Sequence, residues 1–109
     1  LLGALSKAVR RWPGGIYALW YPVKDRQAVA DFREGVLALG LPKVLDIRLD
    51  IRAASQPPRL DGTGMIVVNP PFTLAGELAV ILPALVPLLA EGPGAGFAVE
   101  SLGTEASDA

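Results

Sequence analysis

Apolar side chains in the first half of the chain change their spacing from one segment to the next, and each spacing predicts an element. In residues 1–12 they recur every three or four positions, which predicts an amphipathic helix. Residues 16–21, IYALWY, form a continuous apolar run and predict a strand that is covered on both faces and ended by Pro22. Asp25 then predicts the N-cap of a second helix, which Gly40 ends.

The second half of the chain begins with the alternating segment LDIRLDIR, residues 45–52, which predicts a strand with one apolar and one solvated face. Its charged face indicates a position at the edge of a sheet. Residues 65–68, MIVV, predict a neighbouring strand that is buried on both faces. The apolar run of residues 74–90 predicts a buried helix that Pro83 kinks or restarts, and residues 97–102 predict a last strand. These elements indicate an α/β fold.

Composition limits the chemistry that the chain can perform. Its 109 residues, of which 51% are hydrophobic, suffice for one small domain. The chain has neither cysteine nor histidine, which excludes disulfides, thiolate metal sites and the commonest general base. A formal charge of −1 gives no general attraction to nucleic acid, so such contact requires a local patch. The chain opens within a helical pattern without an initiating Met, and we expect it to be a piece of a longer protein.

The segment that follows the MIVV strand reads Asn-Pro-Pro-Phe and supports two opposed interpretations. In N6-adenine methyltransferases an (Asp/Asn)-Pro-Pro-aromatic box accepts hydrogen bonds from the target amine, and its ring stacks on the extruded base. The residues that match this box by type are Asn69, Pro70, Pro71 and Phe72. A turn also explains them, because prolines cannot continue a ladder, Asn69 can form an Asx turn, and Phe72 can pack on the following helix.

Longer motifs give a more specific resemblance. The segments GGIYALWYPV and GTGMIVVNPPF, followed by the helix that contains Leu-Pro, occur in this order. They resemble the C-terminal part of the bacterial 23S ribosomal RNA (adenine-2030-N6) methyltransferases, a family also named for competence and the use of external DNA. The resemblance extends from Gly14 to about Leu102.

This resemblance implies the C-terminal portion of a Rossmann-like, S-adenosylmethionine-dependent methyltransferase fold, with a mixed sheet and an antiparallel strand near its edge. Residues 1–102 would form that portion, and we expect residues 103–109 to be a disordered tail. The family's glycine-rich cofactor loop, acidic ribose-binding residue and catalytic Asp-Pro-Pro-Tyr box all lie upstream of residues 16–21. We therefore expect the missing N-terminal part to bind S-adenosylmethionine, and this chain to be inactive alone, without catalytic, cofactor or metal residues.

The implied fold places the two motifs at opposite ends of the sheet. The strand that precedes residues 69–72 would run antiparallel between its neighbours, which puts these residues about 15–20 Å from the chemistry. The strand of residues 16–21 would lie beside the missing catalytic strand. We therefore expect Trp20, Tyr21 and Pro22 to line the adenine entrance, with a ring available to stack on a base. The alternative is that they only fill the core and its rim.

Basic side chains supply a candidate contact for the RNA backbone. Lys24 and Arg26 follow the strand, and together with Lys7, Arg10 and Arg11 they form the best local basic patch. A solvated helix face is the alternative interpretation. The acidic residues without a companion pattern are expected to be surface charges: Asp46, Asp50 and Glu100.

The expected partners are 23S ribosomal RNA and the missing N-terminal part of the fold. Without that part, the unpaired apolar edge of residues 16–21 predicts a homodimer. Gly76, Glu77 and two prolines interrupt the longest apolar run, so we expect no membrane span and a cytoplasmic location. Two other classes stay open, namely an autonomous α/β binding module and a minimal methyltransferase that uses residues 69–72.

Overall fold

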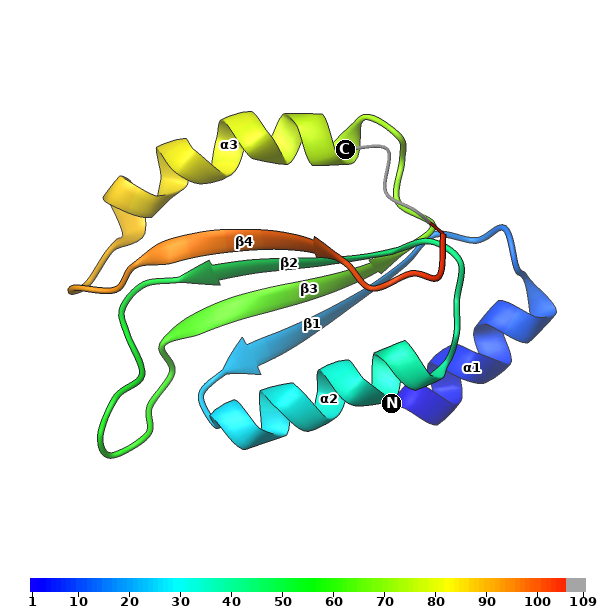
Figure 1. The fold of residues 1–109 in the computed structure, drawn as a ribbon, viewed down its shortest axis with the longest axis horizontal. Coiled ribbons are helices and arrows are strands. Elements are labelled where there is room, and N and C mark those ends of the chain that lie inside the picture. Colours follow the sequence, from blue (N-terminus) through cyan, green and yellow to red (C-terminus); the bar gives the residue numbers. More distant parts are fainter. Residues whose placement is uncertain (106–109) are drawn as a thin grey trace.

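The computed structural model describes residues 1–105 as one four-stranded sheet with helices on both faces (Figure 1). In chain order the elements are α1 (Leu2–Arg11), β1 (Tyr17–Val23), α2 (Arg26–Ala38), β2 (Val44–Asp50), β3 (Gly62–Val68), α3 (Leu74–Leu89) and β4 (Gly96–Ser101). Every helix and strand that the hydrophobic pattern predicts is therefore present, with shifted bounds.

Strand order is β1-β3-β2-β4, and each neighbouring pair is antiparallel. Because β3 lies between β1 and β2 and opposes both, β1 and β2 point in the same direction. This confirms the expected antiparallel strand inserted between two parallel ones. The prediction that β2 forms an edge is wrong, because β4 pairs along it from Leu45 to Asp50. The edges are β1 and β4.

The face of the sheet that α1 and α2 cover contains the hydrophobic core (Figure 1). Asp25 caps α2 as predicted, since its carboxylate accepts hydrogen bonds from the backbone N–H groups of Gln27 and Ala28 at 3.0 and 3.2 Å. Gly40 ends the helix region with a φ of 64°, where a glycine is favoured. The buried members of this core are Leu5, Tyr21, Val23, Val29, Val36, Val44, Ile66, Val68 and Leu102.

The opposite face is covered only in part, by α3, which contacts β4 and β2 (Figure 1). The prediction that α3 is buried is wrong, because Val80 and Leu88 are 75% and 79% exposed. The helix continues through Pro83 and does not restart there. The β1 strand is likewise covered on one face instead of two, because α3 does not reach it and Trp20 remains 56% exposed.

Strand β1 also continues through Pro22 to Val23, where the sequence predicted its end. An edge strand tolerates a proline, because its missing N–H can face the unpaired side.

The predicted tail begins at Gly103. The backbone N–H groups of Thr104 and Glu105 donate to the carbonyls of Leu41 and Pro42, and the remainder of the predicted tail lies outside the described residues. Within residues 1–105, no helix is both long and apolar enough to cross a membrane.

Candidate functional site

One end of the sheet collects the carboxyl ends of the parallel strands β1 and β2. The last residues of these strands, Val23 and Asp50, both pair with Gly62 at the start of β3. Ligands of open α/β sheets bind in the crevice outside the carboxyl ends of parallel strands. We call this end the carboxyl rim, and the opposite end, where Tyr17 and Val44 pair with Val68, the amino rim.

Trp20 approaches the carboxyl rim on the face of the sheet that α3 leaves open. Its indole N–H donates to the hydroxyl of Thr63 on the neighbouring strand. Pro22 and Lys24 follow it and are exposed. Trp20 and Pro22 are thus accessible at the end of the sheet where the sequence predicted a substrate entrance.

Tyr21 lies on the other face and is buried, so the prediction that its ring lines the entrance is wrong. Its hydroxyl donates to the Asp46 carboxylate at 2.6 Å, and its ring lies 5.3 Å from that of Phe32, between centroids. A Cβ on Gly64 would come within 2.0 Å of the ring, so only glycine leaves room for it. Burial, followed by the hydrogen bond to Asp46, raises the pKa of Tyr21.

Asp46 is buried under α2, which corrects its assignment as a surface charge. It is 4% exposed, and Arg33 of α2 places its Nε 2.8 Å from the carboxylate. Arg33 also donates to the exposed Glu100 at 2.7 Å. The Asp46 carboxylate is therefore paired with side chains from β1 and α2 instead of with water. Asp50 stays partly exposed and pairs with Arg48 at 3.1 Å.

Asp61 is a second buried carboxylate, and sequence reasoning missed it. It precedes β3 at the carboxyl rim and is 1% exposed. It accepts from the Ser55 hydroxyl at 2.5 Å, the Ser55 backbone N–H at 2.9 Å and the Arg52 Nε at 2.9 Å. The Ser55 hydroxyl, helped by the Ser55 N–H and Arg52, lowers the pKa of Asp61 to about 2, against the opposing effect of burial. In the sequence, Asp61 lies in a segment rich in Pro, Ser, Asp and Gly, which is typical of a loop.

The predicted basic patch is divided between the two rims. Lys24 and Arg26 follow β1 at the carboxyl rim. Helix α1 ends beside the start of β1, where the Tyr17 hydroxyl donates to the carbonyls of Ala8 and Trp12 at 2.9 Å each. The basic residues of α1, namely Lys7, Arg10 and Arg11, are exposed near the amino rim. The seven residues of β1 separate the two groups by about 20 Å, so they do not form one patch.

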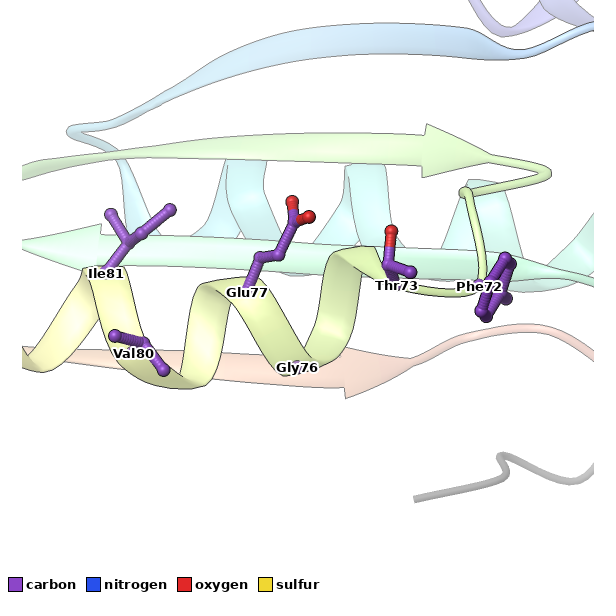
Figure 2. Close-up of a pocket in the computed structure, with 6 residues that line it drawn as sticks. All are labelled: Phe72, Thr73, Gly76, Glu77, Val80 and Ile81. Atoms are coloured by element: carbon purple, nitrogen blue, oxygen red, sulfur yellow. The ribbon is translucent and has the colours of Figure 1, made fainter.

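Residues 69–72 lie at the amino rim, away from Trp20 and Pro22. Asn69 adopts a φ of 54°, and its side-chain amide donates to the carbonyls of Pro13 and Gly15 at 2.8 Å each. Its amide thus joins the end of β3 to the α1–β1 connection. Phe72 is 97% exposed, so the expectation that it packs on the following helix is wrong. It lines a shallow hollow on the outside of α3 with Thr73, Gly76, Glu77, Val80 and Ile81 (Figure 2).

An antiparallel strand inserted between two parallel strands, with helices on both faces, is the arrangement expected for the C-terminal portion of a Rossmann-like methyltransferase sheet. A family model described as "Ribosomal RNA large subunit methyltransferase D, RlmJ" matches residues 1–100. The chain belongs to this family, which confirms the resemblance predicted from its sequence motifs.

Two curated relatives and one solved structure agree with this assignment. The chain is 39% identical over 92 residues to Ribosomal RNA large subunit methyltransferase J of Haemophilus influenzae, covering 84% of this chain and 33% of that protein. It is 35% identical over 85 residues to the Escherichia coli K12 protein of the same name, covering 78% and 30%. The crystal structure of protein LPL1258 from Legionella pneumophila matches with a TM-score of 0.82 and 25% identity, over 94% of this chain and 37% of that one. The chain thus spans about a third of the length of these proteins.

Proposed function

We propose that this chain is the C-terminal part of an S-adenosylmethionine-dependent enzyme that methylates the N6 amine of an adenine in 23S ribosomal RNA. The observation that carries the proposal is the family match over residues 1–100, together with β3 inserted between parallel β1 and β2. The free edge of β1 is where a further parallel strand of such a sheet would pair.

The described residues do not themselves offer a cofactor site. S-adenosylmethionine supplies the methyl group in this class of reaction, and Rossmann-like sheets hold their cofactors on a glycine-rich turn that leads from a strand into a helix. Strand β1 is followed by Lys24 and Asp25, and β2 by residues 51–60, and neither connection has that form. In this proposal the cofactor site and the catalytic box belong to a preceding part of the fold, and the isolated chain is inactive.

In this proposal Trp20 contributes to binding of the target adenine or its neighbours. Its indole is exposed near the carboxyl rim, and stacking on a base is worth about 1–3 kcal/mol. Trp20→Ala should therefore weaken RNA binding by about fivefold or more, while Trp20→Phe keeps a stacking ring and most of the affinity. Unchanged RNA affinity of a normally folded Trp20→Ala enzyme would eliminate this role.

The decisive experiment is methyl transfer by the full-length gene product. It is incubated with radiolabelled S-adenosylmethionine and 23S ribosomal RNA from cells in which the gene is deleted. Label at an adenine N6 position, located by nuclease digestion and mass spectrometry, is the expected result. Label at another base or in no RNA would refute the proposal.

The free edge of β1 also supports a second proposal, about assembly. In the full-length protein the preceding part of the fold pairs with this edge. The isolated chain instead offers an unpaired strand, and we expect it to form homodimers through residues 16–21. A concentration-dependent mass in sedimentation equilibrium, lost when Ala18 is replaced by Pro, is the expected result; a monomer at all concentrations would contradict it.

A further inference from the structure

Three arginines, one from α2 and two from the connection between β2 and β3, lie near the buried Asp61 at the carboxyl rim. Arg26 begins α2, Arg52 follows β2, and Arg59 lies in the connection between β2 and β3. No periodic pattern in the sequence links these positions. The fold brings them together because the ends of β1 and β2 both pair with the start of β3.

Hydrogen bonds fix the connection that carries two of these arginines. Arg52 donates through Nε to Asp61 at 2.9 Å and through Nη2 to the Leu60 carbonyl at 2.8 Å. Ser55 donates both its N–H and its hydroxyl to the same carboxylate. The Nε of Arg59 donates to the Ser55 hydroxyl oxygen at 2.9 Å. The buried Asp61 carboxylate thus fixes the conformation of this loop, while the Arg59 side chain stays exposed at the surface.

Arg26 approaches the same carboxylate from α2 but is not fully engaged by it. Its Nη2 lies 4.0 Å from Asp61, and its side chain is 35% exposed. Its Nε is buried and has no hydrogen-bond partner. Its Nη2 is too far from Asp61 for a hydrogen bond and the side chain is partly exposed, so the terminal N–H groups of the guanidinium can reach an incoming acceptor.

Most acidic side chains near these arginines are already engaged. Asp25 accepts the N–H groups that begin α2, Asp50 pairs with Arg48, and Asp61 is buried. Of the exposed acidic groups, Glu91 lies with Arg52 and Arg59 along a hollow lined by residues 52–59 and 91–93. Against Glu91 and the exposed Asp25 stand the exposed Lys24 and Arg59 and the partly exposed Arg26, so basic groups outnumber exposed acidic ones at this rim.

We propose that Arg26 and Arg59, held by the Asp61 cluster, bind the phosphodiester backbone of the RNA substrate. A guanidinium presents planar paired donors that match two phosphate oxygens, and phosphate contacts position a nucleic acid without reading its bases. The arginines lie at the rim where Trp20 is accessible, so they hold the strand beside the base that is modified. Asp61 is a positioning residue for this contact. The inference rests on the proposed function, because it takes RNA as the substrate.

The test measures binding of a 23S ribosomal RNA transcript to the full-length protein at several salt concentrations. Arg59→Gln and Arg26→Gln should each weaken binding about fivefold to tenfold and lower the salt slope of log Kd by about 1. Lys43→Gln is the matched control, since it removes one exposed positive charge at the amino rim and should change neither quantity.

Asp61→Asn separates positioning from simple stability. It should lower the salt slope although both arginines remain, because the loop no longer holds Arg59 in place beside Arg26. Loss of folded protein alone would reduce the amount that binds but leave the slope unchanged. If the protein methylates RNA and both arginine variants keep wild-type affinity and slope, the inference is wrong while the proposed function stands. If the full-length protein neither binds nor methylates RNA, the proposed function fails and the inference with it.

Discussion

Substitutions of Asn69 distinguish a catalytic Asn-Pro-Pro-Phe box from a structural one, because the two interpretations rank the same variants in opposite order. A catalytic box accepts Asp or Asn, so Asn69→Asp should be tolerated and Asn69→Ala should abolish methyl transfer. The structure instead uses the side-chain amide as a donor to the carbonyls of Pro13 and Gly15. An aspartate has no such donor, so in a structural role both variants destabilise the fold.

The magnitude follows from the two hydrogen bonds and the backbone angle of Asn69. Each neutral hydrogen bond contributes about 1 kcal/mol, so losing both costs about 2 kcal/mol. At a φ of 54° an alanine adds about 1 kcal/mol of strain, which gives about 3 kcal/mol for Asn69→Ala. Asn69→Asp loses the same two bonds and places a carboxylate against two carbonyl oxygens, so it should cost at least as much.

Urea unfolding followed by circular dichroism measures the stability, and methyl transfer by the full-length protein is normalised to the folded fraction. We expect both variants to be destabilised and to keep the wild-type rate per folded molecule. Thr73→Ala is the control, since Thr73 makes no side-chain capping hydrogen bond and should change stability by less than about 0.5 kcal/mol. Wild-type stability of Asn69→Asp, together with loss of rate in Asn69→Ala, would refute this reasoning.

Three further predictions concern the buried network and the loop. Gly64→Ala should lower the free energy of unfolding in urea by about 1–3 kcal/mol, because the added Cβ meets the Tyr21 ring. Gly76→Ala, in open space on α3, should raise it by up to about 1 kcal/mol. Equal effects of the two variants would contradict the packing of Tyr21 against Gly64. Tyr21→Phe should lower the free energy of unfolding by about 1–3 kcal/mol, because the buried Asp46 loses a hydrogen-bond donor, and it should leave RNA affinity unchanged. A loss of RNA affinity without a loss of stability would instead indicate that Tyr21 lines the substrate entrance. The folded pKa of Asp61, about 2, lies below its unfolded value, so its contribution is complete above about pH 4 and is lost as the pH falls towards about 2. Asp61→Asn should remove that part of the pH dependence of unfolding, and an unaltered acid profile would contradict it.

Local signals in the sequence predicted the elements because each depends on near neighbours. The cap at Asp25 and the glycine at Gly40 act within a few residues of the helix that they bound, and MIVV is apolar throughout. The inserted antiparallel strand came from the family resemblance, since no local pattern specifies which strand lies between which.

The errors arose where distant residues decide the environment. The alternating pattern of β2 predicts a solvated Asp46, but Tyr21 of β1 and Arg33 of α2 contact its carboxylate and bury it. The sequence places Asp61 in a loop, and only the folded loop brings Arg52 and Ser55 within hydrogen-bond distance of its carboxylate. For the candidate site, the accessible Trp20 and Pro22 were predictable from strand direction, whereas the arginine cluster depends on the folded connection between β2 and β3.

The most direct test of the central claim is calorimetric titration of S-adenosylmethionine into the full-length gene product and, separately, into the 109-residue chain. The account predicts binding by the full-length product and no binding by the chain alone, because it places the cofactor site in a preceding part of the fold. Binding of S-adenosylmethionine by the 109 residues alone would contradict it.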